Sequence, residues 1–272
     1  PYFISFLILG IPLMWIEWTI GRFGGGQGHS TVPGMFDLMT DGQRSWAKYV
    51  GVIGVVIPLL VFIYYTYVVS WMLGFSFLSL TGGYFGLGGV SGMRDYVYSY
   101  QDVFDSSAHG PWMTVLFFMV TLAFLAAVLR RGVSRGIEKL ALIGMPILFL
   151  FAIVLLIRVL TLPRAMGSPI DGLNFIWNPD WAGLLNARVW LAAAGQMFFT
   201  LSLGVGTIHT YASFLRKEDD ITLAGLSTAT TNEFAEVVLG GTIAIPAAIV
   251  FFGVGETLAI ARDGTYDLAI VA

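Results

Sequence analysis

The sequence predicts an all-α integral membrane protein, and its composition and the length of its apolar runs both indicate this class. Of the 272 residues, 57% are hydrophobic and only 11% are charged, whereas about a quarter of the residues of a soluble domain are charged. The mean hydropathy is +0.80. The apolar runs reach about 20 residues or more, as membrane helices require, and do not follow the shorter alternating pattern of a membrane β-barrel.

Composition and local motifs also exclude several functions. The chain contains no cysteine, which excludes disulfides, thiolate metal sites and cysteine catalysis. The formal net charge of −3 argues against a nucleic-acid partner. Residues 21–29 are rich in glycine but lack the Lys-Ser/Thr pair or the spacing of a nucleotide-binding loop, so we expect a tight exit from a helix there. His29 and His109 lie in expected loops and suggest no metal site.

Six membrane spans are expected from the apolar runs. They cover about residues 1–22, 47–80, 112–130, 137–160, 188–215 and 221–254. The second and sixth exceed the length that a bilayer requires, so we expect them to tilt or project. Residues 171–179 are expected to form a re-entrant or surface-lying turn. We therefore interpret residues 1–272 as one partial transmembrane domain of a multi-pass protein of the cell (inner) membrane.

The positive charges predict which loops face the cytoplasm. Most of the 14 lysines and arginines follow the first, third and fifth spans: Arg22, Arg44, Lys48, Arg130, Arg131, Arg135, Lys139, Arg216 and Lys217. The positive-inside rule places these loops in the cytoplasm. The chain then starts outside the cytoplasm within an apolar run, so we expect at least one further helix upstream. Its apolar end suggests that it is also cut short there.

The fifth span contains a stretch where we expect the helix to open. Ser202, Gly204 and Gly206 follow two phenylalanines near the middle of this span. The backbone groups of an opened membrane helix must be satisfied by protein, ion or ligand. Its two half-helix ends attract a carboxylate and a cation respectively. The alternative is that these glycines, with Gly195, only allow close helix packing.

Carboxylates within the spans are costly and usually mark functional sites, and three are present: Glu17, Glu233 and Glu236. Asn232 and Glu236 share one helix face because they are four residues apart, whereas Glu233 is rotated away from it by about 100°. Adjacent antiparallel helices would bring that face to the depth of Thr200. Amide, hydroxyl and carbonyl oxygens suit a hard cation such as sodium. A hydrogen-bonded cluster that only packs the helices is the alternative.

Two further polar groups lie within the apolar spans. A tyrosine of residues 64–67 is expected to cap the same site, because interfacial anchoring does not explain hydroxyls at mid-membrane. His209 has an apolar setting, and we interpret it as a satisfied packing residue.

Several motifs resemble the neurotransmitter:sodium symporter family, and particularly its prokaryotic amino-acid transporters. Residues 10–22 resemble the second helix of that family, residues 198–204 its broken sixth helix, and residues 232–236 its seventh. The resemblance runs nearly end to end. It implies an inverted-repeat transporter fold with a broken central helix. Six of the family's helices would be present here, from the second to the loop after the seventh.

The resemblance also implies sodium-coupled symport of an amino acid by alternating access, with no enzymatic activity and no organic cofactor. The residues implied in substrate binding are Val61, Tyr65, Phe199, Thr200, Ser202 and Val205. Tyr65 resembles the tyrosine that binds the substrate carboxylate and closes an outer lid, and Phe199 resembles its aromatic partner. Thr200 and Asn232 resemble ligands of the first sodium site. Glu17 resembles a buried glutamate that supports the unwound segment.

Tyr2, Gln196 and Glu236 correspond, with Thr200 and Asn232, to the chloride site of the family. Animal members carry a serine at the position of Glu236 and need chloride. A carboxylate there implies chloride-independent transport and offers a group for proton antiport. Val205 stands where a prokaryotic member carries phenylalanine. The smaller side chain implies room for a neutral substrate with a hydrophobic or aromatic side chain, of unspecified identity.

Other functional classes remain as alternatives. A channel or a non-transporting amino-acid receptor could use the same scaffold, but neither would accumulate solute against a gradient. A membrane enzyme would need a nucleophile–base pair or a metal-ligand set beside Glu236 or His209, and the sequence offers neither at usable spacing. The expected partners are the amino-acid substrate and the lipid bilayer. The oligomeric state is left open.

Overall fold

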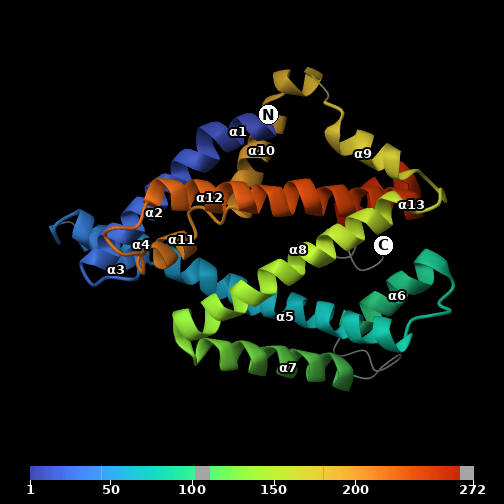
Figure 1. Ribbon diagram of the computed structural model, residues 1–272, viewed down its shortest axis with the longest axis horizontal. Coiled ribbons are helices and arrows are strands. Elements are labelled where there is room, and N and C mark those ends of the chain that lie inside the picture. The colour runs from blue at the N-terminus through green and yellow to red at the C-terminus, as the bar shows by residue number, and fades with distance from the viewer. Residues whose placement is uncertain (44, 102–110, 180, 264–272) are drawn as a thin grey trace. The chain divides into compact units, whose positions relative to one another are not determined.

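The computed structural model describes residues 1–43, 45–101, 111–179 and 181–263, and these form helices joined by turns and loops (Figure 1). Arg44 and His109 lie outside the described residues. In chain order the helices are α1 (Tyr2–Ser5), η1 (Phe6–Gly10), α2 (Ile11–Gly26), α3 (Val32–Met39), α4 (Ser45–Gly51), α5 (Ile53–Thr81), α6 (Gly89–Gln101), α7 (Pro111–Leu129), η2 (Val133–Ile137), α8 (Glu138–Leu160), α9 (Pro169–Trp177), η3 (Trp181–Leu185), α10 (Ala187–Thr200), α11 (Thr207–Ala212), α12 (Ile221–Glu233), η4 (Phe234–Gly241) and α13 (Thr242–Asp263). The expectation of an all-α fold is confirmed.

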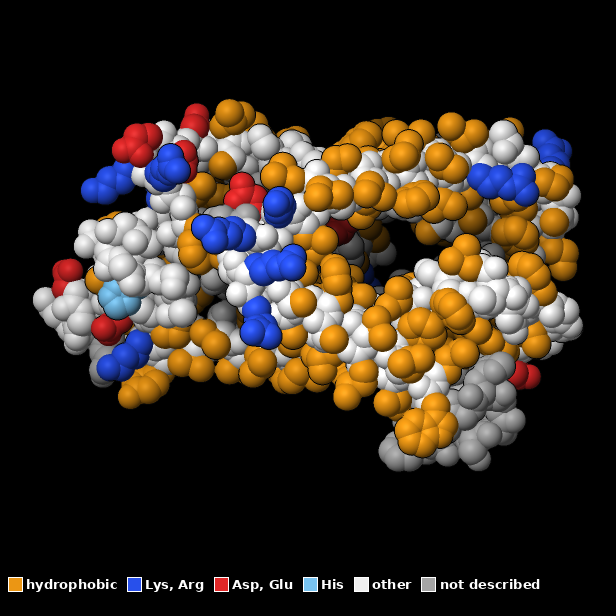
Figure 2. All heavy atoms as spheres, turned by 60° about the horizontal axis from the view of Figure 1, so that its bottom comes forward, with side chains coloured by type: hydrophobic (Ala, Val, Ile, Leu, Met, Phe, Trp, Pro, Cys, Tyr) orange, Lys and Arg blue, Asp and Glu red, His pale blue; other side chains and the backbone are white. Residues whose placement is uncertain are grey.

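Within the described residues, 5 helical segments are long and apolar enough to cross a membrane: Tyr2–Gly26, Trp46–Thr81, Trp112–Leu129, Arg135–Leu160 and Ile221–Ile260. The expected span at 188–215 is not among them. The non-helical residues 201–206 divide it into two shorter helices, α10 and α11. Hydrophobic side chains cover long stretches of the face shown in Figure 2, and Lys and Arg side chains gather in small groups between them. Such a surface suits contact with lipid acyl chains.

The glycine-rich segment continues α2 as far as Gly26, beyond the expected end of the span at about residue 22. A Cβ atom at Gly21 would overlap the carbonyl oxygen of His209, and one at Gly25 would overlap the carbonyl oxygen of Ser213. These glycines therefore let α11 approach the backbone of α2, as small residues do between membrane helices.

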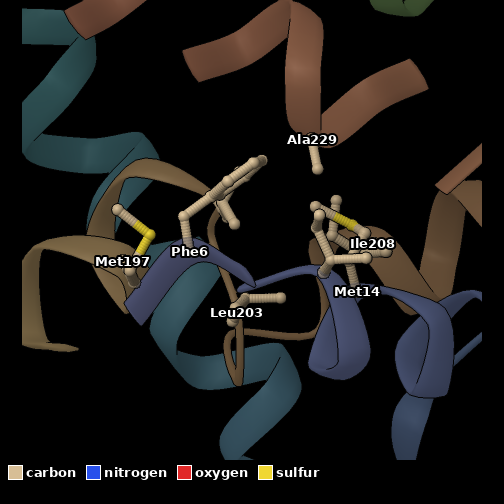
Figure 3. Close-up of a cluster of buried hydrophobic side chains, with 8 residues drawn as sticks. Phe6, Met14, Met197, Leu203, Ile208 and Ala229 are labelled. Carbon is tan, nitrogen blue, oxygen red and sulfur yellow. The ribbon is translucent and has the colours of Figure 1, made fainter. Parts of the chain in front are cut away.

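The chain divides into two compact units, and the first comprises Pro1–Phe62 and Pro179–Val238. Its core is formed by buried side chains of η1, α2, α10, α11, α12 and the segment between α10 and α11. Figure 3 shows Met14 and Ile208 beside each other, with Ala229 of α12 pointing toward them. Between membrane helices, such side chains stabilise the unit by close van der Waals packing and not by leaving water. This core holds α10 against α1 and η1, and α11 against α2.

The second unit comprises Ile63–Asn178 and Leu239–Ala272. Helix α9 packs against α13 in this unit. It forms where the sequence suggested a turn, because Ser168 and Asp171 make a capping box that starts a helix. Gly253, with φ 72° and ψ 167°, interrupts α13 close to the expected end of the sixth span. Tyr100 of α6 is fully buried in an aromatic cluster, and burial raises its pKa to about 12.

Candidate functional site

The opened helix is the centre of the candidate site. Residues 201–206 separate α10 from α11. Within them Ser202 has φ 53°, Gly204 has φ 77° and Gly206 has φ 87°. Positive φ is easy for glycine but uncommon for serine, and such strain is typical of functional segments. The break therefore lies within the stretch where the sequence predicts an opening.

The side chain of Glu17 holds this segment and is itself in contact with His209. The Gly204 amide donates a hydrogen bond to Oε1 of Glu17 at 2.6 Å. The other carboxylate oxygen, Oε2, lies 3.2 Å from Nδ1 of His209 on α11. Glu17 and His209 are both buried, with 7% and 6% of their surface exposed. Glu17 thus contacts both the break and His209, and its supporting role stays a prediction.

Two polar side chains from α12 and η4 form hydrogen bonds with Thr200 at the last turn of α10. Asn232 Nδ2 donates a hydrogen bond to the Thr200 carbonyl oxygen at 3.0 Å. The Thr200 hydroxyl donates to Glu236 Oε2. Asn232 and Glu236 therefore both reach Thr200, as their four-residue spacing predicts. Asn232 Nδ2 also donates to the Thr200 hydroxyl oxygen at 3.4 Å, so the Asn232 Oδ1 atom and one lone pair of that hydroxyl remain available as oxygen ligands for a cation. Their role in binding sodium stays a prediction.

The proposed chloride-equivalent group is only partly brought together. The Tyr2 hydroxyl donates to Glu233 Oε2 at 2.7 Å, rather than to Glu236. Gln196 is exposed on α10. The sequence suggested no role for Glu233, because its side chain lies off the face shared by Asn232 and Glu236. The same rotation about the helix axis indicates that Glu233 contacts a different helix, here α1.

The residues expected to line the substrate pocket lie on α5 and around the break. Phe199 is 67% exposed at the end of α10, and Ser202 and Val205 are half-buried in the break. Val61 and Tyr65 are exposed on α5. Tyr65 belongs to the second unit, where its ring packs edge-to-face on Tyr64 with centroids 5.9 Å apart. An outer lid formed by Tyr65 and Phe199 stays a prediction.

A cavity of about 320 Å³ lies beside the break within the first unit. Most of its wall is apolar or glycine, and the remaining lining groups are a carboxylate and an imidazole. The lining residues are Leu13, Ile16, Glu17, Ile20, Val32, Phe36, Val50, Ile53, Gly54, Gly204, Gly206 and His209. The break therefore borders a largely apolar space with one polar pair.

Membrane-length helices combined with a discontinuous helix are typical of the folds of secondary transporters. Residues 93–263 match the Sodium:neurotransmitter symporter family, and the chain belongs to this family. The family and the membrane-length helices make it a multi-pass membrane protein. The predicted family resemblance and membrane localisation are confirmed.

Three relatives illustrate the similarity. An uncharacterized sodium-dependent transporter of Bacillus subtilis is 32% identical over 91% of this chain and 50% of its own length. Another, of Methanocaldococcus jannaschii, is 28% identical over 85% of this chain and 44% of its own length. The sodium-dependent nutrient amino acid transporter 1 of Drosophila melanogaster is 34% identical over 52% of this chain and 21% of its own length. The chain thus spans about half the length of its prokaryotic relatives.

Proposed function

We propose that the full-length protein is a sodium-coupled amino-acid symporter, and not an enzyme, that works by alternating access. The observation that carries this proposal is the cluster of Thr200, Asn232 and Glu236 at the edge of the helix break. It occurs in a family whose named relatives are sodium-dependent transporters. Oxygen-bearing side chains beside a broken membrane helix are a typical place for coupling ions and substrates.

We further propose which substrate and which ions the protein carries. Val205 leaves room for a neutral amino acid with a hydrophobic or aromatic side chain, and Ser202 and the opened backbone would face its polar groups. Glu236 supplies a negative charge beside Thr200, so transport would not need chloride. The same carboxylate would offer a site for proton antiport.

Uptake into proteoliposomes tests the proposal. The full-length protein would be reconstituted and given an inward sodium gradient with labelled leucine, tyrosine, tryptophan, glutamate or lysine. We expect a neutral amino acid to accumulate above equilibrium, and the accumulation to vanish when choline replaces sodium. Uptake that stops at equilibrium would indicate a channel, and binding without uptake would indicate a receptor.

Substitution of Asn232 tests the sodium-binding role of the cluster. Asn232→Ala removes an oxygen ligand and should raise the sodium concentration for half-maximal uptake. Thr231→Ala is the matched control, because Thr231 is the exposed neighbour of Asn232 on the same helix. Equal sodium dependence in the two variants would contradict the assignment.

Anion replacement tests the role of Glu236. Wild-type uptake should be unchanged when gluconate replaces chloride, because the carboxylate supplies the required charge. Glu236→Ser removes that charge and should make uptake depend on chloride. A large loss of wild-type uptake in gluconate, or a Glu236→Ser variant that ignores chloride, would contradict the assignment.

A further inference from the structure

Glu17 and His209 form a buried polar pair that the transport proposal does not use. Both side chains are more than nine-tenths buried, and both line the cavity beside the break. Within the part of the chain that the structure describes, neither Glu17 Oε2 nor His209 Nδ1 has a hydrogen-bond partner, although these atoms lie only 3.2 Å apart. A buried carboxylate and imidazole in this position require a partner, a charge or a proton to compensate their loss of water.

The other titratable groups of the surrounding helices do not face this pair. On α2, Arg22 donates to the carbonyl oxygen of Asp219, and on α12, Glu233 accepts from Tyr2. Asp37 on α3 is half-buried and is absent from the cavity wall. The remaining titratable side chains of α4 and α11 are exposed: Lys48, Tyr49 and Tyr211. The charge of the pair is therefore set by Glu17 and His209 themselves.

The protonation state of His209 changes the net charge of the Glu17–His209 pair beside the break. An imidazolium would neutralise the carboxylate, and the ion pair would hold Oε2 while Oε1 accepts from Gly204. A neutral imidazole would leave one uncompensated negative charge against an apolar wall, which is strongly unfavourable. The carboxylate would then move toward water, and this movement weakens its bond to the Gly204 amide.

We propose that Glu17 and His209 together form a buried proton-binding site, and that proton binding there closes the Glu17–Gly204 hydrogen bond and restrains residues 201–206. Proton release frees the same segment. The proton is taken from solvent and returned to it, and only the N–H bond of His209 forms and breaks. The site acts on the backbone of the break, whichever solute the protein carries, so it stands independently of the proposed symport.

Backbone hydrogen exchange tests this proposal without a transport assay. The full-length protein in lipid nanodiscs would be labelled between about pH 5 and 8, with labelling times scaled to the intrinsic exchange rate at each pH. The peptide containing residues 201–206 should be protected at least about fivefold more at the acidic end, the lower range of coupling between two sites. A reference peptide from α8 should show constant protection. A flat wild-type profile would overturn the proposal without recourse to any variant.

Three substitutions assign the effect to the pair. His209→Gln and Glu17→Gln should each remove the pH dependence at residues 201–206, because neither variant can form the ion pair that fixes the carboxylate beside the Gly204 amide. His29→Gln is the matched control, since His29 is exposed and absent from the cavity wall. A pH dependence that survives in His209→Gln, or that disappears in His29→Gln, would overturn the proposal. If His209→Gln does not enter nanodiscs, the wild-type profile and Glu17→Gln decide the question.

Discussion

Substituting Gly206 by alanine should destabilise the protein more than the same change at Gly204. Both glycines lie in the break with similar positive φ values, 87° and 77°. A Cβ atom at Gly206 would overlap the carbonyl oxygen of Gly54 and lie 2.8 Å from its Cα atom. A Cβ atom at Gly204 would meet no described atom within 4 Å. The two variants therefore share the conformational penalty and differ in the steric one.

The expected magnitudes follow from these two terms. The left-handed conformation costs a non-glycine residue about 1–2 kcal/mol, so this is the expected loss for Gly204→Ala. Gly206→Ala adds an overlap with backbone atoms that cannot rotate away, and such overpacking costs about 1–3 kcal/mol. The total for Gly206→Ala is then about 2–5 kcal/mol. Its destabilisation should be about twice that of Gly204→Ala.

Thermal unfolding of the full-length protein in detergent micelles provides the assay. Intrinsic tryptophan fluorescence would be recorded at one scan rate for both variants, with and without sodium. A change of 1 kcal/mol lowers the unfolding temperature of a medium-sized domain by about 2–4 °C, so the two variants are distinguishable. Equal shifts, or a larger shift for Gly204→Ala, would refute the assigned approach of the break to Gly54.

Two other predictions concern packing and pH. Gly25→Ala should lower the unfolding temperature because its Cβ overlaps the backbone of Ser213, whereas Gly26→Ala, with no described atom within 4 Å, should not; equal effects would contradict the α2–α11 packing. Burial raises the pKa of Tyr100 from 10.0 to about 12, so folding keeps this phenol protonated. The contribution of this shift to stability is complete below pH 10.0 and is lost as the pH rises toward about 12. Tyr100→Phe should reduce the loss of stability over that interval, as measured by chemical unfolding, and an identical pH profile would contradict the assignment.

The opening of the helix could be predicted from local sequence, because backbone conformation and short spacings determine it. Ser202, Gly204 and Gly206 are closely spaced in a span that otherwise favours a helix. Asn232 and Glu236 meet Thr200 because a four-residue spacing defines a helix face. These features depend on few assumptions about packing.

The partners of Glu17 and Tyr2 could not be predicted in the same way. His209 faces Glu17 because α11 approaches the backbone of α2 at Gly21 and Gly25, and the sequence suggested that the helix ends there. Tyr2 binds Glu233 because of the way α1 meets α12. Contacts between distant segments depend on the approach of whole helices, which residue periodicity does not specify.

The continuous helical segment Tyr2–Gly26 has a mechanical consequence for the opened helix. Its beginning, α1 and η1, packs against α10, and its continuation, α2, packs against α11. One continuous helical segment thus contacts both sides of the break. The two halves cannot rotate away from each other unless this segment bends or slides. The π-helical turn at Phe6–Gly10, which lies between the two contact regions, is the natural place for it to bend.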